Sequence, residues 1–408
     1  MNVSQSQAAG LRSLPNKVSS FASTQAAWRF YDNERVTLPA LAAPLLERAH
    51  LQVERYCTDY ALCVHDWSRL NYRRHSNKSD RYPMTHETDV GYELQSSLLV
   101  SDTQGAPLVP VAHNLVTAEH IWSSYHEAEE ALPRTHLDEL SKRIRWLEQQ
   151  SFSQPLVHII DREGDSVSHF REWQDALWLV RARKTPRIEY QGSSQGCGQV
   201  SSQLNYRYSR EIAFKGKPAQ QWVGEARVRL TRPAKPSQKK RKRPPVPGEA
   251  LEVRLVVSQV RNQAGDVLAE WLLLTNLKAD AVPAEQVALW YYWRWRIESF
   301  FKLLKSAGQQ IESWQQTHGE AIAKRLLVVS MACVLIWEIA ANQSQSAKEF
   351  RQLLIKLSGR QMKWGKEFTH PALLAGLWVY LSMLELIETY PPEQLRQFKN
   401  LSEGILDV

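Results

Sequence analysis

The sequence predicts a mixed α/β fold: a sheet flanked by helices, interrupted by an antiparallel β insertion and followed by a helical region. Three observations predict it. Residues 58–185 show a βββαβαβ order of patterns, residues 186–280 alternate between apolar and polar, and the chain is helical from residue 281 onward. With 408 residues, 43% of them hydrophobic, the chain can fill several cores, which excludes global disorder.

Residues 1–57 are predicted to be a lead-in without periodicity, followed by a helix from about Phe30 to Tyr56. Residues 58–185 then form the first part of the main domain. Its strands are predicted at Tyr60–His65, Tyr92–Val100, Pro107–Ala112, Pro155–Ile160 and Ala176–Arg181, with helices at Leu137–Gln150 and near Ser168.

Residues 186–280 are predicted to form the β insertion. Ala226, Val228 and Leu230 share one face of a strand, while Arg227 and Arg229 share the other, which indicates a basic outer side. Within the insertion, the basic run Lys239–Arg243 lies among prolines, which exclude a regular strand and predict a solvated loop.

Residues 281–318 return to the main domain with a predicted helix at about 283–307. Residues 319–408 form a C-terminal region with helices at about 319–341, 346–358 and 371–389. Its apolar stripe is predicted to pack in a core and consists of Leu326, Val329, Val334 and Trp337.

The charge of the chain favours an anionic partner, because 51 Lys and Arg exceed 43 Asp and Glu and leave a formal charge of +8. The four cysteines have no metal-ligand spacing and predict a reduced, cytoplasmic protein without zinc. The longest apolar stretch, Leu326–Trp337, is shorter than the roughly 20 residues of a membrane-spanning helix, so no membrane segment is expected.

The segment Tyr291–Lys305 is the most informative part of the sequence, and nothing in it breaks a helix. At about 100° per residue, one side collects a single carboxylate, three cations and a phenol: Tyr291, Arg294, Glu298, Lys302 and Lys305. The reverse side is apolar and is expected to pack on a core through Trp293, Ile297, Phe300 and Leu304. One acid among cations suits a metal-binding carboxylate beside a phosphodiester backbone.

Two further acids directly follow apolar runs, Asp66 after Tyr60–His65 and Asp161 after Leu156–Ile160. The carboxyl ends of parallel strands are where such sheets place ligands. Together with Glu298, these acids form a set of hard oxygen ligands suited to two Mg²⁺ or Mn²⁺ ions. The alternative for each aspartate alone is a cap or turn residue.

The spacing of Tyr291, Arg294, Glu298 and Lys305 resembles the Tyr-Arg-Glu-Lys signature of bacterial DDE transposases of the insertion sequence four family. Within that family, the run Arg294–Glu298 looks most like the transposase of transposon five. The segments 64–75 and 160–165 are similar to the family's first and second aspartate segments. The resemblance covers roughly residues 25 to 315, and more loosely the helices beyond.

This resemblance implies a ribonuclease H-like fold and cut-and-paste transposition by two-metal phosphoryl transfer through a hairpin intermediate. It implies that Asp66, Asp161 and Glu298 bind the catalytic metals. The partners it implies are double-stranded DNA, as transposon ends and target, and a second copy of the chain in the DNA complex.

The resemblance also implies DNA-binding roles. Tyr291, Arg294 and Lys305 would hold the 5′ phosphate side of the transposon end, with Lys302 and Trp295 as neighbours. Trp271 would accept a base flipped out of the duplex, and Arg181 would lie near that base.

Two alternatives remain open, because the chain departs from the family at its front, where relatives carry a helical domain that reads the transposon end. A shortened transposase would pair with full-length partners and block them without binding the terminal repeats. A structure-selective nuclease of the same fold would cut DNA without joining it to a target.

Overall fold

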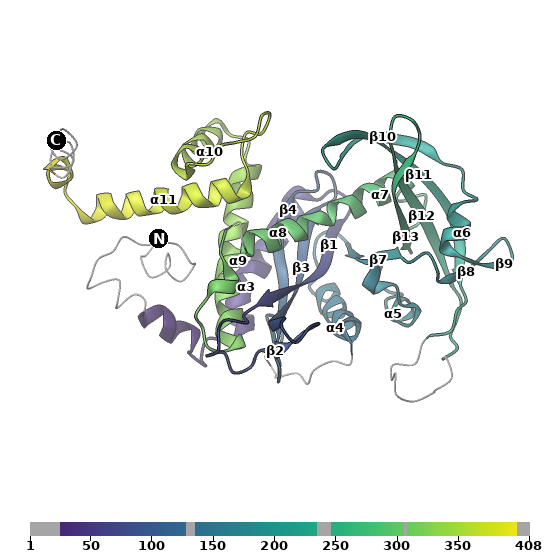
Figure 1. The fold of residues 1–408 in the computed structure, drawn as a ribbon, viewed down its shortest axis with the longest axis horizontal. Helices are drawn as coiled ribbons and strands as arrows, with labels where there is room; N and C mark the ends of the chain where they lie inside the picture. Colours follow the sequence, from purple (N-terminus) through teal and green to yellow (C-terminus); the bar gives the residue numbers. More distant parts are fainter. Residues whose placement is uncertain (1–24, 128–134, 235–245, 306–307, 398–408) are drawn as a thin grey trace.

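One mixed sheet runs through the described part of the protein (Figure 1), which comprises residues 25–127, 135–234, 246–305 and 308–397 of a computed structural model. Within these residues the sheet has 13 strands, of which 11 follow the order β5-β4-β3-β1-β6-β7-β13-β12-β11-β8-β9, while β10 pairs with β11 and β2 pairs with β3. The predicted lead-in and the basic run Lys239–Arg243 lie outside the described residues.

The first half of the sheet has β1 (Ala61–Asn71) at its centre. This strand pairs antiparallel with β3 (Val90–Ser101) on one side and parallel with β6 (Leu156–Ile160) on the other. Outside these lie β4 (Pro107–Val116), which pairs with β3, and β7 (Leu177–Ala182), which runs parallel to β6. The two short strands are β2 (Tyr82–Pro83) and β5 (Ile121–Ser123). The predicted βββαβαβ order and the ribonuclease H-like fold class are confirmed.

The insertion continues the same sheet. Its last strand, β13 (Val267–Thr275), pairs antiparallel with β7, and β12 (Leu251–Arg261) and β11 (Lys217–Leu230) follow outward. The remaining insertion elements are β8 (Arg187–Tyr190), β9 (Ser193–Gly196), β10 (Arg207–Phe214) and the short helix α6 (Cys197–Ser201). The predicted alternation on β11 is confirmed, because Val228 and Leu230 are buried while Arg227 and Arg229 are exposed.

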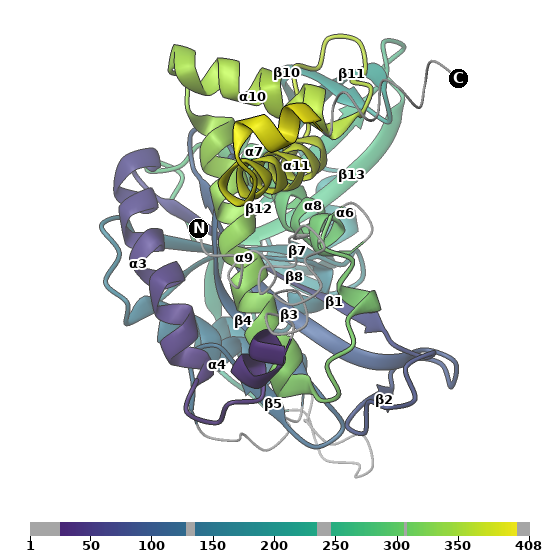
Figure 2. The same cartoon turned by 90° about the vertical axis from the view of Figure 1, so that its left-hand side faces the viewer.

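Helices cover both faces of the first half of the sheet. On one face lie α3 (Leu38–Tyr56), α8 (Trp295–Leu304) and α9 (Gly319–Ala341), which share a core with apolar residues of β1, β3 and β6 (Figure 2). On the other face lie α4 (His136–Glu148) and α5 (Val167–Glu172), packed on Ile160 and β7. The helix predicted from about Phe30 to Tyr56 is interrupted: residues 25–31 are helical, a turn follows, and α3 begins at Leu38. There the Thr37 hydroxyl accepts the Ala40 N–H and caps the helix.

The prediction of a single helix over about 283–307 is wrong in one respect, because two helices meet at Arg294. These are α7 (Ala284–Trp293) and α8, and Arg294 keeps helical torsions between them. The amides of Arg294 and Ile297 donate to carbonyls three residues back. The backbone hydrogen bonds at this junction therefore have the tighter 3₁₀ spacing instead of α-helical spacing. Trp293, Ile297, Phe300 and Leu304 are buried, as predicted.

The C-terminal helices are α9, α10 (Gln345–Ser358) and α11 (His370–Thr389), as predicted. The stripe of Leu326, Val329, Val334 and Trp337 is buried, so the core prediction for it is confirmed. Among the described residues, α11 alone is long and apolar enough to cross a membrane by length and composition. It extends away from the body (Figure 1) and exposes four large apolar side chains: Val379, Met383, Leu384 and Ile387.

Candidate active site

The register of the central strands brings Asp66 and Asp161 level with each other. His65 of β1 is paired with Ile160 of β6, so the next residue of each chain is an aspartate. We expected Asp66 to follow its strand, but Asp66 lies within it, because β1 continues to Asn71 beside β3. Asp66 is instead the first residue of β1 beyond its parallel ladder with β6, and Asp161 directly follows β6.

Both aspartates belong to the side of the sheet that α8 covers. Side chains alternate along a strand, and Val64 and Ile159, two residues before each aspartate, lie in the core beneath α8 and α9. Asp161 also caps a short 3₁₀ turn, where its Oδ1 accepts the Glu163 N–H at 3.2 Å. The cap role that we considered as an alternative is therefore present together with the position beside Asp66.

Arg294 connects the acids of the sheet with the acid of α8. Its guanidinium donates to Asp66 Oδ2 at 2.7 Å and to Glu298 Oε1 at 2.6 Å. Arg294 is 5% exposed, whereas the side chains of Asp66 and Glu298 keep 18% and 37% of their surface exposed. The junction between α7 and α8 thus holds the buried Arg294 guanidinium between the partly exposed carboxylates of Asp66 and Glu298.

The electrostatics of Asp66 reflect this crowding. Burial raises the pKa of the Asp66 carboxyl to about 6, and the negative charges of Asp161 and Glu298 act in the same direction. Arg294 and the Trp67 N–H, which donates to Asp66 Oδ1 at 2.9 Å, oppose the rise in pKa. The three acids are therefore close enough to influence one another, which is the condition for a shared site.

The donor set fits hard divalent cations. Asp66, Asp161 and Glu298 offer only carboxylate oxygens, which Mg²⁺ and Mn²⁺ prefer, and all three side chains are partly open to solvent. Burial is the main cause of the raised pKa of Asp66, with smaller contributions from Asp161 and Glu298, and a bound cation would stabilise the ionised form of all three carboxylates. A cation bound there competes with the Arg294 guanidinium for Asp66 and Glu298.

The raised pKa of Asp66 predicts a pH-dependent cation affinity. Its folded pKa lies above the ordinary 3.8, so the protonated form contributes stability at low pH that is lost as pH rises through about 6. Below about pH 6 protons compete with the cation for the Asp66 carboxylate. We expect the Mg²⁺ concentration for half-saturation to rise about tenfold for each pH unit below that value. Titration calorimetry between about pH 5 and pH 8 measures this, and a flat profile contradicts it.

Two of the residues predicted to share the polar side of one helix, Tyr291 and Lys305, have other surroundings. Tyr291 is 4% exposed and belongs to the core, where burial raises the pKa of its hydroxyl to about 12. Lys305 lies beyond the last residue of α8 in a non-helical conformation, and its ammonium contacts the Arg69 carbonyl and, at 3.6 Å, Glu312. The predicted cationic row is therefore broken, with Lys302 exposed on α8.

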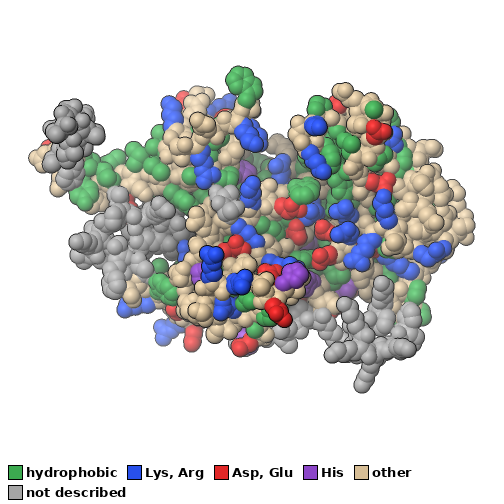
Figure 3. Space-filling view, in the orientation of Figure 1, with side chains coloured by type: hydrophobic (Ala, Val, Ile, Leu, Met, Phe, Trp, Pro, Cys, Tyr) green, Lys and Arg blue, Asp and Glu red, His purple; other side chains and the backbone are tan. Residues whose placement is uncertain are grey.

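The remaining predicted residues lie around this centre. Trp295 is 50% exposed, with the Arg294 guanidinium 5.4 Å from its ring. Arg181 on β7 interacts with the Tyr291 hydroxyl, and this interaction opposes the rise in the pKa of that hydroxyl that burial causes. Trp271 lies on β13, half-buried against the Phe214 ring, two residues from the position paired with Arg181. In Figure 3 basic and acidic side chains gather in the middle of the visible face, between the C-terminal helices and β10–β13.

A second group of titratable side chains lies on the opposite face of the sheet. Cys63, His65 and His158 bring possible ligand atoms within 4.8 Å of one another, and all three are fully buried. Each imidazole nitrogen already has a partner, because a chain of 2.8 Å hydrogen bonds runs from Ser97 through His65 and His158 to Glu148. This group is a satisfied polar part of the core under α4.

Sequence reasoning missed the residues that directly follow the two aspartates, Trp67 and Arg162. Both line a cleft at the same edge of the sheet, together with Arg181, Arg183 and Lys184. For Trp67 the signal was available, because a residue that follows an inward-facing acid on a strand points to the other side of that strand. Arg162 begins the 3₁₀ turn after β6, where strand alternation gives no such signal.

Residues 126–335, slightly more than half of the chain, match the family described as Transposase DDE domain. The match includes Asp161 and Glu298 and begins after Asp66. No curated protein matches the chain.

Proposed function

Because the chain belongs to the family of transposases with a DDE domain, we propose that it is a cut-and-paste transposase that uses two metal ions. A DDE transposase is a nuclease and strand transferase that acts on DNA, generally with divalent metal ions. One observation carries the finer proposal. The register of β1 and β6 and the contacts of Arg294 bring Asp66, Asp161 and Glu298 to one place on the sheet edge.

In this proposal the three carboxylates are metal ligands and not general bases. Two Mg²⁺ or Mn²⁺ ions, when bound, lower the pKa of an attacking water or DNA 3′-OH and stabilise the leaving oxygen. The exposed Lys302 and the partly buried Lys305 attract the phosphates of the transposon end along α8. Trp295, 50% exposed beside Arg294, is the neighbouring aromatic contact for that DNA.

The Tyr-Arg-Glu-Lys spacing supports membership of the insertion sequence four family, and the run Arg294–Glu298 resembles the transposase of transposon five. On that basis hydrolysis frees a 3′-OH, and this hydroxyl attacks the opposite strand to form a hairpin. A second hydrolysis reopens the hairpin before the end joins target DNA. Trp271 accepts the flipped base in this scheme, and Arg181 lies on the neighbouring strand β7.

The hairpin step gives a selective prediction. Trp271→Ala removes the stacking surface for one unpaired base, which is worth about 1–3 kcal/mol. We expect the first nick to keep its rate within about twofold while hairpin formation slows by roughly ten- to one-hundredfold. Denaturing gels resolve the nicked and hairpin products. Trp222→Ala on β11 is the matched control, and equal loss of both steps in Trp271→Ala contradicts the assignment.

The exposed apolar face of α11 supports a homodimer in the DNA complex. Val379, Met383, Leu384 and Ile387 follow helical spacing on a helix that extends from the body, and such a face suits a second copy of the chain. We expect Met383→Glu with Ile387→Glu to give a monomer on DNA in light-scattering measurements. Leu353→Glu on α10, likewise a substitution of an exposed apolar residue, is the control. A dimer that persists in the double variant contradicts this interface.

One assay separates the proposed function from its two alternatives. Linear DNA with the repeats that flank the coding region is incubated with the protein, Mg²⁺ and a target plasmid. A transposase cuts at the repeats and joins the ends to the plasmid. A non-catalytic inhibitor forms dimers but neither binds the repeats specifically nor cuts, and a structure-selective nuclease cuts branched DNA without joining it.

A further inference from the structure

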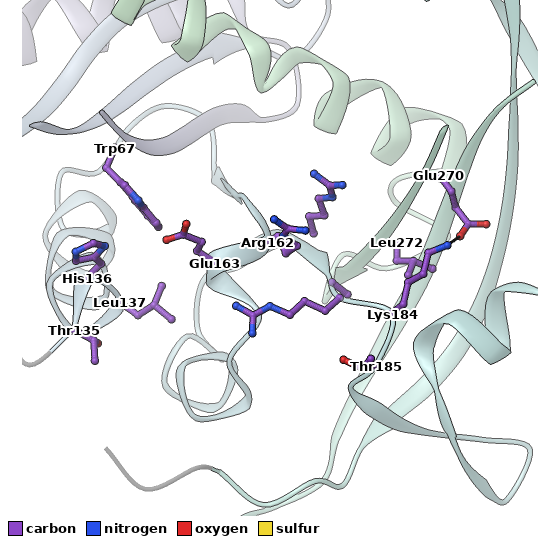
Figure 4. A pocket seen from close by; sticks show the side chains of 13 residues that line it. Trp67, Thr135, His136, Leu137, Arg162, Glu163, Lys184, Thr185, Glu270 and Leu272 are labelled. Atoms are coloured by element: carbon purple, nitrogen blue, oxygen red, sulfur yellow. Dashed lines mark ion pairs between the residues drawn. The ribbon is translucent and has the colours of Figure 1, made fainter. Parts of the chain in front are cut away.

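We propose that the cleft behind the acids binds the DNA that flanks the transposon, on the far side of the scissile phosphate from α8. This inference rests on the proposed function. The cleft has a volume of about 1120 Å³ and lies at the carboxyl ends of β6 and β7 (Figure 4). Its walls come from the start of α4, the turn after β6, the segment after β7, and β13.

The position of the cleft follows from strand geometry. Asp66 faces α8, so the next residue, Trp67, faces the opposite side of the sheet, where its ring meets His136 at the start of α4. Arg162, which follows Asp161, begins the 3₁₀ turn Arg162–Gly164 and also lines the cleft. The cleft therefore begins one residue from each aspartate, and its Trp67 wall lies on the side of the sheet away from α8. A DNA strand that passes over the acids leaves α8 and enters this cleft.

The charges of the cleft suit a phosphate backbone. Four cations and two acids line it, so 4 − 2 gives a net charge of +2, from Arg162, Arg181, Arg183 and Lys184 against Glu163 and Glu270. Glu270 is engaged by Lys184 at 3.1 Å. Arg162 and Arg183 are exposed, and neither forms an ion pair with an acid among the described residues. These two guanidinium groups are free to hold phosphates.

The aromatic wall of the cleft points to an unpaired nucleotide. Trp67 is partly exposed, and its ring packs edge-on against His136 at 5.3 Å between centroids, which holds the indole in place. In Figure 4 Trp67 faces into the cleft, with Glu163 between it and Arg162. A fixed indole beside free guanidinium groups is the combination that binds single-stranded nucleic acid. The first flanking nucleotide therefore stacks on Trp67 while its neighbouring phosphates meet Arg162 and Arg183.

The test compares two DNA substrates with Ca²⁺ in place of Mg²⁺, to suppress cleavage. One carries the element's own end with flanking DNA, and the other is the same end already cut at the boundary. We expect Arg162→Ala with Arg183→Ala to weaken binding of the flanked end about tenfold and to lower its salt slope by about 2. The pre-cut end should bind as it does to the unmodified protein. Lys363→Ala with Lys366→Ala removes the same charge from an exposed loop and is the control.

The stacking contact has its own readout. The fluorescence of 2-aminopurine at the first flanking position is quenched by stacking in the free duplex. It should stay quenched on binding because Trp67 replaces the stacking partner, and Trp67→Ala should raise it without weakening the pre-cut end. Equal loss of affinity for both substrates, or quenching that survives Trp67→Ala, overturns the proposal. If the unmodified protein binds and cuts the flanked end in Mg²⁺ while these results fail, the function stands and the cleft assignment falls. If it does not cut at all, both fall.

Discussion

Asp161→Asn should reduce Mg²⁺-dependent strand cleavage by roughly a thousandfold, because a metal-held charge is worth several kcal/mol in phosphoryl transfer. Asparagine keeps an oxygen that can accept the Glu163 N–H, so the turn after β6 stays capped. Asp161→Ala should lose cleavage equally. DNA binding in a band-shift assay should stay within about twofold, because one lost carboxylate leaves the phosphate-binding cations in place.

Asp175→Ala is the control for this experiment. Asp175 is exposed and lies just before β7, at the opposite edge of the sheet from Asp161, so cleavage should persist. If Asp161→Asn still nicks DNA while its binding is unchanged, Asp161 is not a metal ligand.

Arg294→Met should destabilise the metal-free protein by about 3 kcal/mol, because it leaves two carboxylates without the cation that they share. The partial exposure of Asp66 and Glu298 keeps this cost at the low end of the range for buried pairs. Mg²⁺ should then recover most of the loss, since the ion supplies the positive charge that methionine lacks. Urea unfolding with and without Mg²⁺ measures both effects.

Arg69→Met is the matched control, because Arg69 is half-exposed and pairs with Asp89 at 3.3 Å on the surface. Its loss should cost less than about 1 kcal/mol and should not depend on Mg²⁺. A Mg²⁺-independent loss of stability in Arg294→Met shows that Arg294 acts only as a core residue and not as a partner of the metal site.

Periodicity predicted most of the fold, because each strand of the first half of the sheet is apolar and each helix buries one face. The same reasoning identified Asp66 and Asp161 as residues that follow apolar runs. It also identified the buried side of α8, where Ile297 and Phe300 lie.

Periodicity failed where tertiary contacts decide the geometry. The run that predicts the end of a strand at His65 does not show that β3 continues alongside β1 to Asn71. An ideal helix also places Arg294 and Lys305 on one solvated side. In the structure, the Asp66 carboxylate pairs with the buried guanidinium of Arg294, and α8 ends before Lys305. Single-residue spacing along a helix carries no information on such partners from other elements.

The pairing of β13 with β7 joins the insertion directly to the half of the sheet that carries the acids. Four residue pairs join these strands, and the Thr275 hydroxyl and the Asn276 side chain both bond to the backbone of Trp178. Sliding the insertion relative to the acids would break these hydrogen bonds, which favours a shape change in the DNA over one in the sheet when the proposed complex forms. Stiff DNA sequences should for that reason be cut more slowly than flexible ones.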